Sequence, residues 1–245
     1  MERFFDDGCG GFGFFQSMEK LAETYEVSQV ALESWQGSYN IRPRAFAPII
    51  RQKDGQREAV LGRFGLVPSW FRGDPSKAGW INARSETVEQ KRAFAGSFRH
   101  HRALLPSDFF LEFALNPADP KHKVPILFKA RADELLTMGA IYATWTDAEG
   151  RALNTFGILT TEANSLVARY HSRMPLLLAR KDWAAWLEPE SEPEALRKLL
   201  KPYPPSKMTA FRVRQEIGNA RNDYPELIEP QPPIPVTPSQ PAWES

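Results

Sequence analysis

The sequence predicts an α+β protein: a single domain with a curved, largely antiparallel β-sheet that forms a barrel-like core, and with helices on its flanks. Many short apolar stretches have the length and aromatic or β-branched content of strands. A few helical segments lie among them, without the regular strand–helix alternation of a parallel sheet. At 245 residues the chain can bury one sizeable core, and nothing requires a second.

The clearest helix signal is near the N-terminus. Ser17 is a good N-cap, and Met18, Leu21 and Tyr25 then lie on one face of a helix that is expected to end near Val27. Further helices are expected at residues 85–94, 162–169 and 182–187.

The clearest strand signal is a hairpin. Residues 47–52 and 58–64 read as strands, and Lys53-Asp54-Gly55 between them is typical of a tight turn. Further strands are expected at residues 103–105, 109–113, 124–128, 135–143, 156–160 and 208–213. Residues 231–245 are rich in proline and are expected to form a disordered or extended tail.

Composition excludes several classes of protein. A net charge of +1 excludes a polycation, so any nucleic-acid contact has to come from local groups of arginines. No apolar run is long enough to span a bilayer, and the first residues are acidic instead of resembling a signal peptide. We therefore expect a cytoplasmic monomer that does not bind membranes. The arginines do gather, at Arg42 and Arg44, Arg84, Arg99 and Arg102, Arg169 and Arg173, and Arg212, Arg214 and Arg221.

Cys9 is the only cysteine. It cannot form an internal disulfide, and it has no neighbours at metal-ligand spacing, so no metal and no cofactor are expected. Cys9 is then either a small buried apolar residue or a nucleophile. Gly8 and Gly10 on either side favour the nucleophile, because glycines let the backbone approach a ligand closely.

Several motifs together make the chain resemble the SRAP family, the SOS response-associated peptidases that shield abasic sites in single-stranded DNA by covalent attachment. Each motif is weak alone, but their order along residues 9–230 is specific. They are Cys9-Gly10 with Phe12, residues 39–43 (Tyr-Asn-Ile-Arg-Pro), 65–71, 81–87 (Ile-Asn-Ala-Arg-Ser-Glu-Thr), 110–113 (Phe-Leu-Glu-Phe), 160–164, 171–175 (His-Ser-Arg-Met-Pro), and 217–219 before 226–228.

The implied chemistry explains why such a family needs an N-terminal cysteine. An abasic site exposes a sugar aldehyde, which a primary amine attacks to give a Schiff base. A thiol two carbons away then closes a five-membered thiazolidine. The α-amine has an ordinary pKa of about 7.7–8.0, against about 10.4 for lysine, and ring closure gains the advantage of an intramolecular step.

The resemblance also implies roles for individual residues. Glu112 would be the acid/base that opens the sugar ring, Asn82 would hold the amine of Cys9, and His171 would move protons during formation and reversal of the Schiff base. Single-stranded DNA with an abasic site is the implied partner. Its binding residues would be Arg84 and Arg173 at the phosphates, Asn40 and Thr160 along the pocket, and Trp70 and Phe71 as a wedge against the bases.

Each of these residues also has an ordinary structural interpretation. A glutamate that alternates with apolar neighbours normally faces solvent, and a histidine beside an arginine is more often structural than catalytic. Asn40 and Asn82 are common turn or cap residues, and a Trp-Phe pair is usually core. The ordered set of motifs favours the functional interpretation; no single member does.

Two features depart from the usual family pattern. Members usually begin Met-Cys, whereas eight residues precede Cys9 here and keep its nitrogen an amide. The usual Cys-Gly-Arg-Phe reads Cys9-Gly10-Gly11-Phe12, so an arginine that would contact phosphate is missing.

Two hypotheses follow. In the first, residues 1–8 are a leader that is removed, and the domain of residues 9–230 then crosslinks to abasic DNA; the family's peptidase name implies that the same site can remove such a leader, and the sequence leaves open whether it does so here. The alternative is a non-covalent single-stranded DNA-binding relative with an inactive site. We favour the first because Asn82, Glu112 and His171 are all present.

Overall fold

The structure is a computed structural model that describes residues 9–31, 35–132 and 134–239. Its strands are β1 (Gly11–Phe14), β2 (Gln29–Ala31), β3 (Ser38–Ile41), β4 (Phe46–Lys53), β5 (Gln56–Phe64), β6 (Asn82–Arg84), β7 (Arg102–Ser107), β8 (Phe109–Ala114), β9 (Val124–Ala130), β10 (Leu136–Thr146), β11 (Ala152–Glu162), β12 (Arg173–Pro175) and β13 (Met208–Arg212). Its α-helices are α1 (Met18–Tyr25), α2 (Ala95–His100), α3 (Trp183–Leu187) and α4 (Pro193–Leu199).

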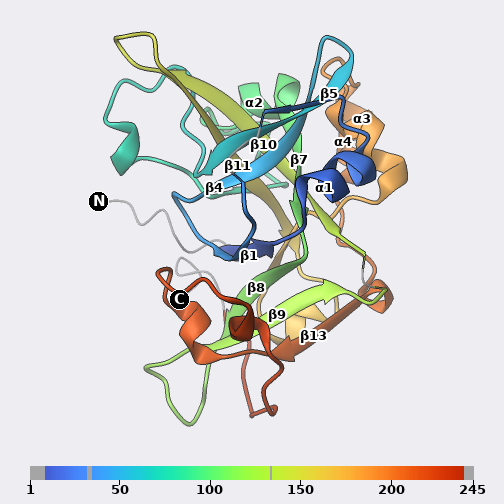
Figure 1. Cartoon of the computed structure of the whole chain (residues 1–245). Coiled ribbons are helices and arrows are strands. Elements are labelled where there is room, and N and C mark those ends of the chain that lie inside the picture. Colours follow the sequence, from blue (N-terminus) through green and yellow to red (C-terminus); the bar gives the residue numbers. More distant parts are fainter. Residues whose placement is uncertain (1–8, 32–34, 133, 240–245) are drawn as a thin grey trace.

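Five strands close into a barrel, which confirms the predicted α+β class with a barrel-like core (Figure 1). Strand pairing runs β11-β10-β7-β4-β5, and β5 then pairs with β11 again, in parallel, at Phe64 and Phe156. The rings of these two residues stack in the core with their centroids 5.3 Å apart. Most other pairings are antiparallel; β2 with β5 and β6 with β11 are parallel.

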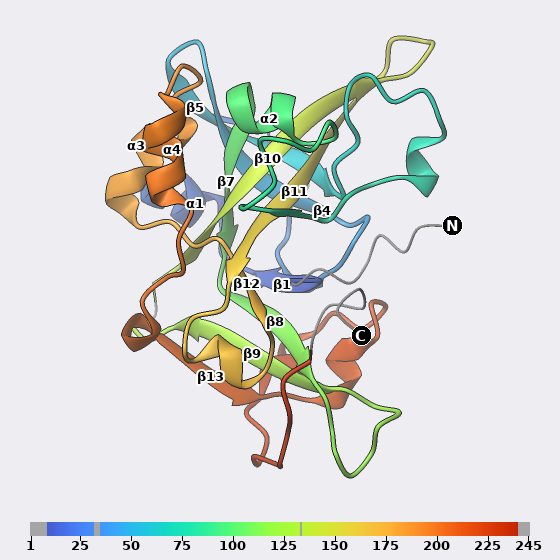
Figure 2. The same ribbon diagram turned by 180° about the vertical axis from the view of Figure 1, so that it is seen from behind.

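A second sheet has the order β13-β9-β8-β1-β3, and all its pairings are antiparallel. Figures 1 and 2 show it below the barrel, with α1, α3 and α4 beside the barrel on one flank. Asp108 alone separates β7 of the barrel from β8 of this sheet. Its N–H donates to Gly13 O at 2.8 Å, and its carboxylate accepts the Phe15 N–H at 2.9 Å. Asp108 therefore ties β1 to the point where the chain passes between the sheets.

The strongest local sequence signals are confirmed. The Ser17 hydroxyl caps α1 by accepting the Lys20 N–H at 3.1 Å. The turn between β4 and β5 consists of Asp54 and Gly55, whose φ angles of 50° and 77° are the positive pair that a tight hairpin needs. In the described ranges, no helix has the length and apolar character needed to cross a membrane.

Two helix predictions are wrong. Residues 85–94 form successive turns, and α2 begins only at Ala95, because the Ser85 N–H donates to Thr160 O and so extends the β6–β11 pairing. Within 162–169 only a short 3₁₀ turn, η2 (Val167–Arg169), forms. Glu162 instead pairs with Arg173 in the β11–β12 ladder.

The proline-rich segment is extended, and it packs on the domain as far as Ser239. Thr237 and Leu115 exchange backbone hydrogen bonds of 2.9 and 3.0 Å, while Ile234 and Val236 pack against the main core. Proline favours extended backbone, which lets the segment lie along an edge strand. Of the two expected states, disordered or extended, residues 231–239 adopt the extended one. The expected leader, residues 1–8, and the last residues, 240–245, lie outside the described part.

Ending the chain after Pro230 is expected to destabilise the protein, because Ile234, Val236 and Thr237 lose their contacts. A loss of about 2 kcal/mol would lower Tm by roughly 4–8 °C. Thermal unfolding followed by circular dichroism checks this, with Pro232→Ala, at an exposed position of the same segment, as the control. An unchanged Tm in the shortened chain would contradict the docked tail.

Candidate active site

The pairing of β1 with β8 brings the N-terminal cysteine to the strand that carries Glu112. Gly11 lies opposite Leu111, and Cys9 precedes β1 by two residues. The Cys9 thiol is fully buried and donates to Gly11 O at 3.5 Å. Burial, together with the nearby charge of Glu112, raises the pKa of this thiol well above its ordinary range. Cys9 is therefore a neutral thiol at neutral pH, held within electrostatic range of Glu112.

Glu112 is a buried carboxyl group rather than a solvent-facing one, with only 3% of its surface exposed. Burial raises its pKa well above the usual value, and the positive charges of Lys123 and Arg42 offset part of that rise. Its Oε1 accepts no hydrogen bond from the described residues. A carboxyl group with a raised pKa and an unsatisfied oxygen is suited to exchange protons with a ligand.

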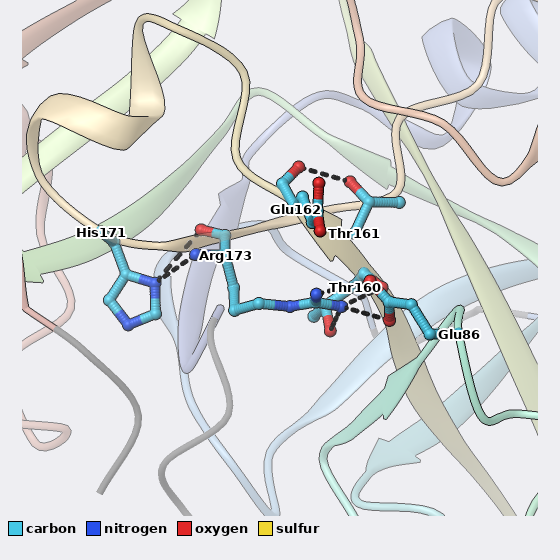
Figure 3. Close-up of polar contacts among 6 residues, drawn as sticks. All are labelled: Glu86, Thr160, Thr161, Glu162, His171 and Arg173. Carbon is cyan, nitrogen blue, oxygen red and sulfur yellow. Dashed lines mark hydrogen bonds and ion pairs between the residues drawn. The ribbon is translucent and has the colours of Figure 1, made fainter. Parts of the chain in front are cut away.

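His171 lies beside Glu112, with 4.0 Å between its Nδ1 and Glu112 Oε2. The Arg173 N–H donates to the same Nδ1 at 3.0 Å, as Figure 3 shows. The carbonyl oxygen of Arg173 lies 3.2 Å from the same Nδ1, so the tautomer decides which of the two contacts is a hydrogen bond. His171 is 7% exposed and lines the same cavity as Glu112.

Glu112 and His171 line a cavity of about 550 Å³. Its wall also includes Gly10, Arg42, Lys123 and Ser239. Ile81 lines the same cavity, whereas the next residue, Asn82, is buried on β6 opposite Ile158 of β11. The structure thus brings the regions of Cys9, Glu112 and His171 together. Asn82 directly follows a residue of the cavity wall but does not itself line the cavity, and its amine-holding role stays a prediction.

Thr160 and Arg173 belong to the edge where β6, β11 and β12 meet. Arg173 is 6% exposed, and its two terminal nitrogens bind the Glu86 carboxylate at 2.6 and 2.9 Å (Figure 3). One of them also donates to Thr160 O at 2.8 Å. Arg84 is half-buried and pairs with Thr160 across β6 and β11. A phosphate would have to compete with Glu86 for Arg173, so the predicted grip of these arginines stays a prediction.

Trp70 and Phe71 are on the connection between β5 and β6. Trp70 is 42% exposed, and the Arg92 guanidinium lies 4.6 Å from its ring. Phe71 is half-buried, and its carbonyl accepts from Trp145 Nε1 at 2.8 Å. The exposure agrees with a wedge at a surface, but Trp70 lines a different cavity from Glu112. The wedge stays a prediction.

Asn40 has a structural role. Its amide nitrogen donates to the carbonyls of Ile217, Asn219 and Asn222 at 3.1, 3.1 and 2.8 Å, and its Oδ1 accepts from Arg42 Nε at 2.7 Å. Asn40 therefore holds residues 217–222 and orients Arg42, which does line the cavity.

The motif analysis missed Ser239, a buried residue in the cavity wall. Its hydroxyl donates to Phe113 O at 2.6 Å, and its backbone exchanges hydrogen bonds with Tyr170 and Ser172 at 2.9 and 3.3 Å. These partners directly flank Glu112 and His171, so Ser239 ties the two segments together. No sequence signal marked it, because proline-rich composition alone does not predict docking.

Fold and site define a small barrel protein in which a histidine and a glutamate line one cavity beside a buried cysteine. A family model described as SOS response associated peptidase (SRAP) matches residues 8–220. The chain belongs to this family.

Named relatives agree with this assignment. "Abasic site processing protein YoqW" of Bacillus subtilis is 33% identical over 224 residues, covering 90% of this chain and 99% of that protein. "Abasic site processing protein HMCES" of Gallus gallus is 32% identical over 225 residues, covering 79% of this chain and 66% of that protein. A crystal structure from Bacteroides thetaiotaomicron has a TM-score of 0.81 at 25% identity, covering 91% of this chain and 100% of that one.

Replacing Glu112 with glutamine is expected to stabilise the protein at neutral pH. Because the native pKa of Glu112 is raised above its usual 4.5, the folded state holds its proton more tightly than the unfolded state. Stability then falls as pH rises from about 4.5 toward the native pKa. Glu112→Gln removes this fall, and each kcal/mol gained would raise Tm by about 2–4 °C at pH 7 to 8.

Thermal unfolding across this pH range checks the effect. Glu190→Gln, at an exposed glutamate, is the matched control and should leave the wild-type pH profile unchanged. A Glu112→Gln variant with the same pH profile as the wild type would show that Glu112 does not titrate with a raised pKa.

Proposed function

We propose that this protein binds single-stranded DNA at an abasic site and, once Cys9 is the N-terminal residue, forms a covalent thiazolidine with the sugar aldehyde. Its family membership and the names of its relatives support abasic-site processing. Two observations carry the finer proposal. The β1–β8 pairing brings the segment of Cys9 to the strand of Glu112, and Glu112 Oε2 lies 4.0 Å from His171 Nδ1.

The covalent step balances without a cofactor. The Cys9 amine adds to the aldehyde carbon, and loss of one water gives the Schiff base. The Cys9 sulfur then adds to that carbon, and the thiol proton ends on the ring nitrogen. Bonds from one carbon to nitrogen and to sulfur replace its double bond to oxygen, so nothing is oxidised or reduced.

Glu112 and His171 supply the proton transfers. Abasic deoxyribose exists mostly as a closed ring, and opening it requires a proton on the ring oxygen and loss of the hydroxyl proton. A carboxyl group with a raised pKa can donate the first, and neutral imidazole can accept the second. His171 can return its proton to the leaving water, and Asn82 would orient the amine.

The strand would lie across the cavity with phosphates at Arg84 and Arg173. Asn40 and Thr160 would hold the walls of the pocket through their hydrogen bonds to neighbouring segments. Trp70, which is exposed, and Phe71 would separate the bases beside the abasic nucleotide.

Maturation is part of the proposal. While residues 1–8 are attached, the Cys9 nitrogen is an amide and cannot form a Schiff base. The peptidase activity would cut the bond before Cys9, with Cys9 as nucleophile and Glu112 and His171 as proton carriers. Cleavage would also make the buried Cys9 segment a chain end, which can move to admit the aldehyde.

Non-covalent binding of single-stranded DNA is the alternative function. It is favoured by the amide state of Cys9 in the uncut chain and by the full burial of its sulfur. The arginines and the fold would then bind DNA without any crosslink.

Incubation with single-stranded DNA that carries one abasic site tests the proposal. A chain that begins Met-Cys9 is expected to give an adduct that survives denaturing electrophoresis, because removal of methionine exposes the 1,2-aminothiol. Full-length protein whose intact mass shows residues 1–8 in place is expected to give none.

Cys9→Ala in the short chain is the control. It keeps a free amine, so it can form only a Schiff base, which hydrolyses unless borohydride reduces it. Equal crosslinking by uncut and short chains would mean that a lysine supplies the amine. Absence of any adduct from the short chain would leave non-covalent binding as the function.

A further inference from the structure

The guanidinium of Arg42 occupies the place that a side chain at position 11 would take. A Cβ built on Gly11 would lie 2.8 Å from Arg42 Nη1 and 2.9 Å from its Cζ. Such a contact is too short for a real side chain unless Arg42 moves. Gly11 does not have a positive φ, so its backbone would accept another residue. Positions 11 and 42 therefore share one space, and Arg42 fills it.

Neutral oxygens hold Arg42 in this place. Within the part of the chain that the structure describes, Nε donates to Asn40 Oδ1 at 2.7 Å and Nη2 to Ile217 O at 2.6 Å. Nη1, the nitrogen that faces Gly11, makes the longest hydrogen bond, 3.4 Å to Gly10 O. The guanidinium also lies over the ring of Phe113, with Cζ 5.1 Å from the ring centre. No carboxylate of a described residue takes a hydrogen bond from this guanidinium, so its charge is positioned but not neutralised by an ion pair.

The positive charge of Arg42 lies at the wall of a cavity that other basic residues also line. Arg42 lines the cavity that contains Glu112 and His171, and Lys123 and Arg44 line it too. Arg44 adopts a φ of 78°, a left-handed conformation that is unusual for a residue other than glycine and that recurs at functional sites. Glu112 is the one acidic residue that lines the cavity in the described chain, and its raised pKa favours the neutral form. The cavity is therefore electropositive and suited to an anion.

We propose that Arg42 binds a phosphodiester group of the DNA strand from the space that belongs to residue 11. This inference rests on the proposed function and deepens it, because it adds a phosphate-binding residue at the cavity itself. Arg42 then supplies the positive charge that Gly11 lacks, and the site keeps its hold on the strand although the arginine expected at position 11 is absent. Its forked guanidinium can donate to the phosphate through Nη1 while Nε and Nη2 remain bound to the protein.

A reciprocal exchange tests the shared space. The four full-length proteins are wild type, Arg42→Gln, Gly11→Arg, and Gly11→Arg combined with Arg42→Gln. The readout is non-covalent affinity for a single-stranded oligonucleotide without an abasic site, measured at several salt concentrations. Arg42→Gln is expected to weaken binding about tenfold and to reduce the slope of log affinity against log salt by about 0.7, the value for one phosphate contact on a single strand.

The double variant is expected to recover most of the affinity and the salt slope, because an arginine from position 11 can enter the space that Arg42 has left. Gly11→Arg alone is expected to lower Tm, since two side chains then compete for one place. Arg131→Gln is the matched control: Arg131 also donates to carbonyls, of Ser206 and Met208, but it does not line the cavity. It should leave affinity and slope unchanged.

The outcomes separate this inference from the proposed crosslink. An Arg42→Gln variant that binds with wild-type affinity and salt slope would overturn the phosphate contact, even if its Tm falls through loss of the bond to Ile217. A double variant that binds no better than Arg42→Gln would overturn the shared space. Failure of the short chain to crosslink, with the affinity pattern intact, would overturn the covalent chemistry and still support Arg42 as the phosphate-binding residue.

Discussion

The candidate site depends on the register of β1 against β8. Side chains of a strand alternate between its two faces, so a slip by one residue would turn the side chains of β1, and the chain before it, to the opposite face of the sheet. Asp108 fixes the register by binding the backbone of Gly13 and Phe15. Gly13 contributes as well, because a Cβ there would lie 2.3 Å from the ring of Phe109. A hydrogen-bonded corner and a close backbone approach thus set where Cys9 lies relative to Glu112.

The other half of the site depends on β11, the strand that closes the barrel. On one side it pairs with β10 and then with β12, and on the other side with β5 and then with β6. Closure of the barrel thereby places Asn82 and Arg84 on the strand next to Thr160. After β11 the chain reaches His171 just before β12. Residues from distant motifs meet because one strand serves both the core and the site. The docked tail joins the segments of Glu112 and His171 through the hydrogen bonds of Ser239.

The features that the sequence predicted well depend on local chemistry. Ser17 caps a helix and Asp54-Gly55 forms a turn whatever the rest of the chain does. Residues 85–94 and 162–169 did not form the predicted helices. The first residue of each segment continues a strand pairing, Ser85 with Thr160 of β11 and Glu162 with Arg173 of β12, and no local window contains these partners. Glu112 could be named through family resemblance, but its burial could not. Arg42 was noted only as one of several grouped arginines, and Ser239 was not noted at all. Their places depend on the folded chain: Arg42 fills the space beside Gly11, and Ser239 completes the cavity wall only when the tail docks.

The buried polar groups at this cavity lower the stability of the folded protein. Selection for stability alone would not favour them. A neutral thiol, a carboxyl group with an unsatisfied oxygen and an arginine held by neutral acceptors are each less stable there than apolar residues would be. The groups offset one another only in part, since Arg42 and Lys123 lower the pKa of Glu112 without restoring it to its usual value. A negatively charged ligand that carries its own hydrogen-bond acceptors would complete the arrangement: it would take the charge of Arg42 and let Glu112 stay protonated. The proposed phosphate contact at Arg42 would therefore offset part of the cost of these buried groups.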